Sequence, residues 1–248
     1  MAIVSGLIWF IVTLSACFLT MRFYLPYYRK SHKPAKAPIS SESESNNDTT
    51  DKKDSTNVVV GSKSLLKSKT SKIVVLSLIS IYSFICGFFA YCNVDNVLNI
   101  IKLAIGMIII SMVVITDLDM CIIPNLFVLA LLISRVLVLI AELVTSGVDA
   151  LKLFANNLLV CIGIVVFLFI MSRITKGGLG EGDIKLYGAI GFMCGLYTVF
   201  FTLFFALLAS AIVSIILLLL KKKKLRDSFP MGPLICLGYG LAIILSLA

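Results

Sequence analysis

Two aspartates stand where apolar segments of this sequence meet polar ones, and acids in that position are candidates for chemistry. Asp117 ends the apolar run 108–116, and Asp183 closes the glycine-rich segment 177–183. An ionisable group beside an apolar helix is costly to keep there, so such a group is a functional hypothesis by default. We predict that Asp117 and Asp183 are a catalytic pair at one face of a helix bundle.

The chemistry open to such a pair is peptide hydrolysis. Two carboxylates close together in a low-dielectric bundle cannot both stay ionised, so they hold one proton between them. The ionised acid can then take a proton from an attacking water, while the protonated acid polarises the scissile carbonyl. This reaction requires no histidine, serine, cysteine or metal, and we predict no metal site. The single histidine, His32, falls in a polar segment.

The residues around the two acids suit an active-site loop. Gly180 and Gly182 precede Asp183 and permit close approach of a substrate peptide. Pro124 and Asn125 follow Asp117 and suit a turn and a helix start. Taken one at a time, however, these residues have an ordinary explanation, because Asp is a common helix cap and glycine a common loop residue.

A third acid, Asp119, follows Asp117 by two residues. If the helix continues, the two side chains point about 200° apart, so they cannot share one proton. We expect one to face the bundle and the other to face water.

The composition sets the elements that must position these acids. Hydrophobic residues make up 59% of the 248 residues, charged residues only 14%, and mean hydropathy is +1.05. These values exclude a water-soluble globule. At about 20 residues a span, we predict an all-α polytopic membrane bundle of about eight transmembrane helices, which are 1–20, 73–92, 97–116, 126–143, 158–171, 184–220 divided near Gly195, and 231–247.

The charge pattern predicts the topology. Of 22 Lys and Arg residues, 18 fall in the loops 22–72, 117–124, 172–183 and 221–230. Cytoplasmic loops carry such an excess of positive charge, so the amino terminus is predicted to be outside and the acids to face the cytoplasm. Topology accounts for the net charge of +9 without a nucleic-acid partner.

The chain divides into three parts. Residues 1–21 are predicted to be the first transmembrane helix, 22–72 a disordered basic cytoplasmic loop near anionic lipid, and 73–248 a multi-helix membrane peptidase domain. The seven cysteines include no CxxC pair, so neither a disulfide framework nor a zinc site is predicted.

At these residues the chain resembles the type IV prepilin peptidases, membrane aspartyl proteases with a GxGD signature. The resemblance covers roughly 73–248 and has three elements in order. Asp117 stands seven residues before Pro124-Asn125, residues 180–186 read Gly-Glu-Gly-Asp-Ile-Lys-Leu, and residues 229–233 read Phe-Pro-Met-Gly-Pro.

The resemblance implies that Asp117 and Asp183 cut the basic leader from prepilins or pseudopilins at the cytoplasmic face of the bacterial inner membrane. Those precursors carry a hydrophobic helix directly after the leader. Longer members of the family carry two CxxC pairs between the first two spans and also methylate the new amino terminus with S-adenosylmethionine. This chain lacks those pairs, which sets it apart from the methylating members. The resemblance implies no cofactor for proteolysis, and S-adenosylmethionine is implied only if methyl transfer is retained.

Other functions compete with this interpretation. An ion- or proton-coupled transporter would use Asp117 and Asp183 as ligands near a broken helix, but transport sites lie near the bilayer midplane and both acids adjoin predicted loops. Another GxGD protease, of the presenilin or signal-peptide type, is a further alternative. A membrane scaffold would tolerate the loss of both acids.

Overall fold

The computed structural model describes residues 2–27, 69–94, 96–175, 179–219 and 230–245. In this part of the chain every regular element is a helix, which confirms the all-α prediction. The α-helices are α1 (Ala2–Leu19), α3 (Lys69–Asn93), α4 (Val97–Met120), α5 (Asn125–Ser146), α6 (Val148–Ile174), α7 (Glu181–Cys194), α8 (Leu196–Leu219) and α9 (Gly232–Leu245), and a π-helical turn, η1 (Thr20–Tyr24), continues α1.

Six of these helices are long and apolar enough to cross a membrane: those numbered 1, 3, 4, 5, 6 and 8. Helices α7 and α9 have 14 residues each, about 21 Å at 1.5 Å a residue, which is shorter than a hydrocarbon core of about 30 Å. The chain is therefore a multi-pass membrane protein, with two short helices in place of two of the eight predicted full spans.

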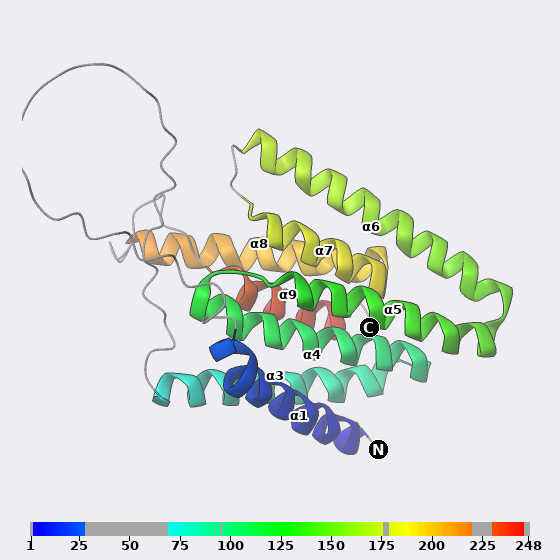
Figure 1. Cartoon of the computed structure of the whole chain (residues 1–248), viewed down its shortest axis with the longest axis horizontal. Coiled ribbons are helices and arrows are strands. Elements are labelled where there is room, and N and C mark those ends of the chain that lie inside the picture. Colours follow the sequence, from blue (N-terminus) through cyan, green and yellow to red (C-terminus); the bar gives the residue numbers. More distant parts are fainter. Residues whose placement is uncertain (1, 28–68, 95, 176–178, 220–229, 246–248) are drawn as a thin grey trace, which may run out of the picture.

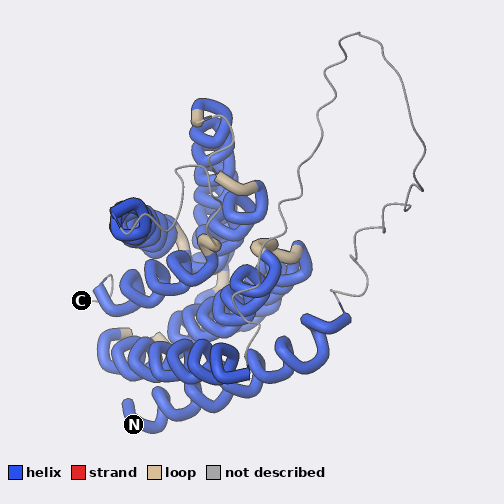
Figure 2. The backbone as a smooth tube through the Cα atoms, turned by 90° about the vertical axis from the view of Figure 1, so that its left-hand side faces the viewer, coloured by secondary structure: helices blue, strands red, loops and turns tan. Residues whose placement is uncertain are grey.

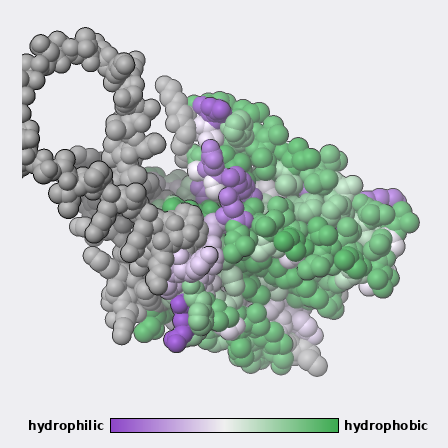
Figure 3. All heavy atoms as spheres, in the orientation of Figure 1, coloured by the Kyte–Doolittle hydropathy of each residue, from purple (hydrophilic) through white to green (hydrophobic). Residues whose placement is uncertain are grey.

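Large apolar side chains cover the outside of the bundle. Leu137, Leu159 and Phe200 are each more than half exposed, as are many others on the outer helix faces. Figure 3 shows this surface as nearly continuous green, with hydrophilic residues gathered where the loops leave the bundle and at the far tip of the α5–α6 hairpin. A soluble protein does not leave so much apolar surface in water, whereas lipid requires it.

Helix α4 lies inside the bundle and touches α1, α3, α5, α7 and α9. Figure 2, viewed along the bundle, shows the helices side by side. Met107, Ile110 and Val113 on α4 are fully buried among these neighbours. The carboxyl-terminal turn of α4, which carries Asp117, is therefore surrounded by protein.

The helix ends that the charge pattern assigns to one side of the membrane do lie at one end of the bundle. Helices α4, α6 and α8 finish there and α5, α7 and α9 begin there, on the left in Figure 1. We call this the site end. Helix α1 begins at the opposite end of the bundle. The predicted topology requires this, because it places the amino terminus on the other side of the membrane from these loops.

Two predicted boundaries are confirmed. The long apolar run 184–220 is divided at Gly195, whose positive φ of 88° ends α7 and allows α8 to start at the next residue. Helix α5 begins at Asn125 directly after Pro124, which adopts an extended conformation.

Two other boundaries differ from the prediction. Residues 144–157 separate two of the predicted spans, yet they are helical except at Gly147, where α5 turns directly into α6. Asp149 and Lys152 form an exposed ion pair in the first turn of α6, so their charge fits a helix start and does not mark a loop. The ends of the predicted loop 22–72 are also helical, through Tyr27 and again from Lys69, and residues 28–68 lie outside the described part.

Candidate active site

Asp117 lies in the last turn of α4, with its side chain inside the protein. The residue is 5% exposed. The helix runs on to Met120 and is capped by Cys121, whose backbone N–H donates to the Asp117 carbonyl at 2.8 Å and whose φ is +52°. This left-handed cap stops α4 and turns the chain toward α5.

Asp183 lies in the first turn of α7 and is 9% exposed. The helix is capped at Gly180, and the backbone N–H of Gly180 donates to the Asp183 carboxylate. An acid at the third helical position commonly reaches back to the cap in this way, because that N–H has no partner within the helix. The GxGD segment thus places the Asp183 carboxylate against the backbone of Gly180.

The structure brings these two acids together from helices distant in sequence. Asp183 lies outside the six candidate spans, and its pKa is raised from 3.8 to about 6, first by burial and then by the nearby charge of Asp117, against the Gly180 hydrogen bond. An electrostatic effect of one carboxyl on the other requires that the two lie near each other. Their action as a catalytic pair stays a prediction.

A third helix completes the site through Gly232, the first residue of α9. Its backbone N–H donates to Asp117 Oδ2 at 2.6 Å. A methyl group added at Gly232 would lie 2.9 Å from Asp117 Cβ, so only glycine lets α9 approach this closely. Sequence reasoning placed Gly232 in a matching motif but gave it no role, because nothing in the sequence shows which acid α9 meets.

Asp119 corrects a prediction. We expected one of Asp117 and Asp119 to face water, yet Asp119 is also buried, at 4% exposed. The reason is the central place of α4: protein surrounds its last turn on more than one side, so a rotation of about 200° does not reach solvent.

The segment predicted to be an active-site loop packs against the protein itself. A methyl group at Gly182 would lie 3.0 Å from Ile123 Cβ, so Gly182 lets α7 begin close against the turn between α4 and α5. Pro124 in that turn is buried, whereas Asn125 and Gly180 are exposed. Contact of these four residues with a substrate stays a prediction.

An apolar groove runs beside Asp117 between three helices. Its volume is about 260 Å³, and we call it the α3–α4–α9 groove. Tyr82 is its only lining residue with a polar side-chain group other than a thiol, and its hydroxyl donates to the Leu237 carbonyl at 2.7 Å. The lining residues are Val75, Leu78, Ile79 and Tyr82 of α3, Val114 and Leu118 of α4, and Pro233, Cys236 and Leu237 of α9.

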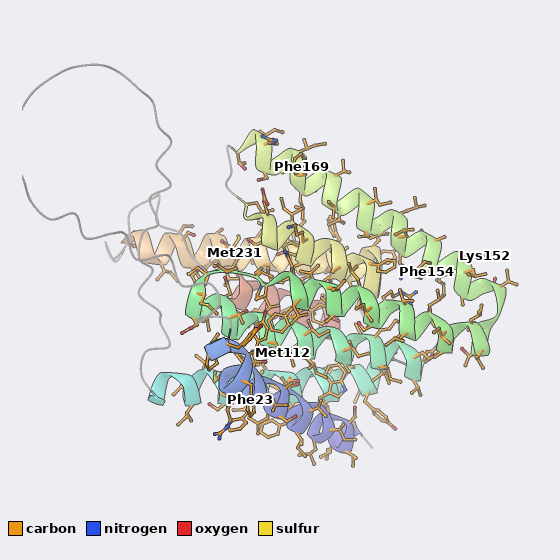
Figure 4. The ribbon with its side chains drawn as sticks, in the orientation of Figure 1. Phe23, Met112, Lys152, Phe154, Phe169 and Met231 are labelled. Carbon is orange, nitrogen blue, oxygen red and sulfur yellow. The ribbon has the colours of Figure 1, made fainter. Side chains whose placement is uncertain are left out.

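A cluster of charges far from the site end was not predicted. Glu142 of α5 accepts from Lys102 of α4 at 2.9 Å and from the fully buried Arg135 of α5 at 2.8 Å. The Arg135 guanidinium also lies 5.7 Å from the Phe154 ring of α6. Figure 4 labels Phe154 near the end of the bundle opposite Met231, which adjoins Gly232.

We call this set the Glu142 cluster. The signal that could have revealed it is an arginine in the middle of an apolar run with a glutamate seven residues on, two helical turns along the same face. Its ion pairs hold α4 and α5 together, away from the site end where Asp117 and Asp183 lie.

The fold and the site thus define a helical membrane protein with a buried pair of carboxyl groups at one end of its bundle. Residues 103–215 match the model of the type IV leader peptidase family. This segment contains Asp117 and Asp183 and is similar to that family.

Among curated proteins, the chain is similar to a protein of Bacillus subtilis (strain 168) named prepilin leader peptidase/N-methyltransferase. The two are 30% identical over 134 residues, which are 53% of this chain and 50% of the relative. The chain thus spans about half the length of the curated relative it matches. No solved structure matches this chain significantly.

Proposed function

We propose that this protein is a membrane-embedded aspartic endopeptidase that removes the basic leader from type IV prepilins or pseudopilins. The observation that carries the proposal is the buried approach of Asp117 and Asp183, which is close enough for one charge to raise the pKa of the other carboxyl. The family match includes both acids, and the name of the Bacillus subtilis relative gives the substrate class.

The pair would work with one proton between its two carboxyl groups. The ionised member takes a proton from water as the water oxygen attacks the scissile carbonyl carbon. The protonated member donates to the carbonyl oxygen, and a proton then passes to the amine as the C–N bond breaks. The Gly232 and Gly180 N–H groups fix the carboxyl groups in place while the proton moves.

Location and partners follow from the same proposal. With the site end in the cytoplasm, the basic leader remains on the side of the membrane where precursors are made, and this membrane is the bacterial inner membrane. Prepilin or pseudopilin precursors and membrane lipids are the expected partners, and no nucleic-acid partner is proposed. The transporter alternative lacks support, because the family match points to a peptidase and the acid pair lies at the end of the bundle.

Methyl transfer is not assigned to any residue here. The relative's name includes N-methyltransferase, and S-adenosylmethionine would supply the methyl group. The α3–α4–α9 groove beside Asp117 does not fit that cofactor, because it offers no charged side chain and its Tyr82 hydroxyl is already bonded. Mass spectrometry of the cleaved product decides whether its new amino terminus is methylated.

Co-expression with a tagged prepilin tests the peptidase proposal, with leader removal followed as a gel shift. Wild type should cleave, Asp117→Asn and Asp183→Asn should abolish cleavage, and Asp119→Asn is the matched control because it is an equally buried acid on the same helix turn. Cleavage that survives both first substitutions would overturn the aspartyl mechanism.

A further inference from the structure

We propose that the Glu142 cluster binds a small inorganic anion of chloride size on the free edge of the Arg135 guanidinium. The cluster lies away from the site end, near the Phe154 label in Figure 4. The inference goes beyond the proposed peptidase function and does not depend on it.

Arg135 carries hydrogen-bond donors that no described residue uses. The residue is fully buried, and its Nη1 donates to Glu142 Oε2 at 2.8 Å. Its Nε and Nη2 atoms are also buried, and neither has a hydrogen-bond partner within the described part of the chain. Leaving buried donors unpaired costs free energy, so such atoms call for an acceptor, either a water molecule or an ion.

The arrangement of these two atoms suits an anion. The Nε–H group and one N–H group of Nη2 point in parallel from one edge of the planar guanidinium. This edge is the fork with which arginine holds an anion through two hydrogen bonds. The guanidinium does not lose its proton in proteins, so the edge remains a pair of charged donors.

The charge of the cluster favours an anion over a water molecule. Lys102 and Arg135 both pair with Glu142, so two positive charges meet one negative charge and the sum is +1. The side chains of Lys102 and Glu142 are only 13% and 7% exposed, so water screens this charge poorly. Burying an uncompensated charge is expensive. Water would accept the two hydrogen bonds but leave the charge, whereas an anion satisfies both.

No other described acid supplies the missing negative charge. The Phe154 ring lies 5.7 Å from the Arg135 guanidinium and gives it a cation–π contact, but the ring has no net charge. The remaining described acids lie either at the site end or in the exposed ion pair with Lys152, and they are Asp117, Asp119, Asp149, Glu181 and Asp183.

The occupant must be small. Protein atoms close off both Nε and Nη2 of Arg135. Beside the cluster, the Phe154 ring of α6 packs edge-to-face on the Phe192 ring of α7, with 5.1 Å between the ring centroids. A lipid phosphate carries a glycerol backbone and acyl chains, which cannot follow it into such an enclosed place. A chloride ion is about as small as the water molecule that it replaces.

Chloride binding to the purified full-length protein in detergent tests the proposal. Radiolabelled chloride is titrated at constant ionic strength, with bulky gluconate as the balancing anion. We expect saturable binding of one chloride per chain. Lys102→Gln should weaken it at least about tenfold, because the cluster becomes neutral while Arg135 keeps its pair with Glu142. Lys152→Gln is the matched control, since it removes the same charge from an exposed ion pair.

Two further readouts follow from the same site. Chloride should raise the thermal unfolding temperature of wild type and of Lys152→Gln by mass action, and should not raise that of Lys102→Gln. Arg135→Lys keeps the charge but removes the fork, so it should also weaken binding. Lys102→Gln decides the question if Arg135→Lys does not fold.

Three results would overturn the proposal. Folded wild type without saturable chloride binding would leave water as the occupant of the Arg135 edge. Equal affinities of wild type and Lys102→Gln would place the chloride outside the Glu142 cluster. A phospholipid that native mass spectrometry finds on wild type and not on Lys102→Gln would replace the small ion with a lipid.

Discussion

Gly232 shows how much of this site depends on a residue that has no side chain. Its N–H meets Asp117 Oδ2, and its missing methyl group is the space into which the Asp117 side chain packs. Asp183 depends in a similar way on Gly180, whose backbone supplies the hydrogen bond to that carboxyl. At the residue scale, the two acids are held by backbone groups of neighbouring glycines.

Gly232→Ala should therefore slow leader cleavage. The added methyl group pushes α9 and Asp117 apart, and a displacement of a fraction of an ångström at a reacting group costs about ten- to a hundredfold in rate. Gly163→Ala on α6 is the control, because nothing lies within 4 Å of the added methyl group there. Initial rates of cleavage are measured on one prepilin peptide. Equal rates for the two variants would show that Gly232 has no role in the site.

The burial of Asp183 predicts a dependence of stability on pH. Its pKa rises from 3.8 to about 6 in the fold, so the folded protein binds this proton more tightly than the unfolded chain. The associated stability is fully present below pH 3.8 and is lost as pH rises through about 6. Asp183→Asn should thus stabilise the protein at pH 7.5 by up to about 3 kcal/mol, and much less near pH 4.5.

Thermal unfolding in detergent at the two pH values measures this difference. Asp149→Asn serves as the control, because the Asp149 side chain is 75% exposed and should change little at either pH. An Asp183→Asn variant that is less stable than wild type at pH 7.5 would show that burying the ionised Asp183 carboxylate does not destabilise the folded protein.

At the scale of elements, the bundle keeps its two kinds of buried charge apart. The acid pair lies at the site end, where α4 finishes and α7 and α9 begin. The Glu142 cluster lies toward the other end and joins α4 to α5. Helix α4 is thereby fixed at two points, which limits how far Asp117 can move relative to its neighbours.

Glu142→Gln should destabilise the protein strongly. The substitution leaves Arg135, which is fully buried, and Lys102 without their counter-ion, and breaking a buried pair in this way costs about 3–5 kcal/mol. Asp149→Asn again provides the matched case, since its partner Lys152 is equally exposed and surface pairs contribute little. Thermal unfolding of both variants is the measurement, and a Glu142→Gln protein as stable as wild type would contradict a structural role.

Sequence patterns predicted those elements that end at residues with strong backbone preferences. Gly195 divides α7 from α8 because its positive φ ends a helix, and Pro124 stands just before α5, where its missing N–H leaves no helical hydrogen bond unmade. The α5–α6 turn was missed because charge near Asp149 resembles a loop when only the sequence is known. The burial of Asp119 and the role of Gly232 depend on which helices surround α4. That packing cannot be predicted from the sequence next to either residue.

At the scale of the whole molecule, an apolar exterior surrounds a small number of polar contacts. The helices expose leucine, isoleucine and phenylalanine to lipid over most of the surface in Figure 3. The short helices α7 and α9 do not span a bilayer by themselves, and both begin at the site end, where they bring Asp183 and Gly232 to Asp117. Their shortness fits elements that build a site at the membrane surface.

The central claim is that Asp117 and Asp183 act as one catalytic unit. Purified protein in lipid vesicles, mixed with a synthetic prepilin peptide, allows leader release to be timed by mass spectrometry for wild type, Asp117→Asn, Asp183→Asn and the double variant. Groups that act as a unit are strongly non-additive, so each single variant should lose as much activity as the double variant. Single variants that each keep a measurable rate, with losses that multiply in the double variant, would contradict a shared mechanism.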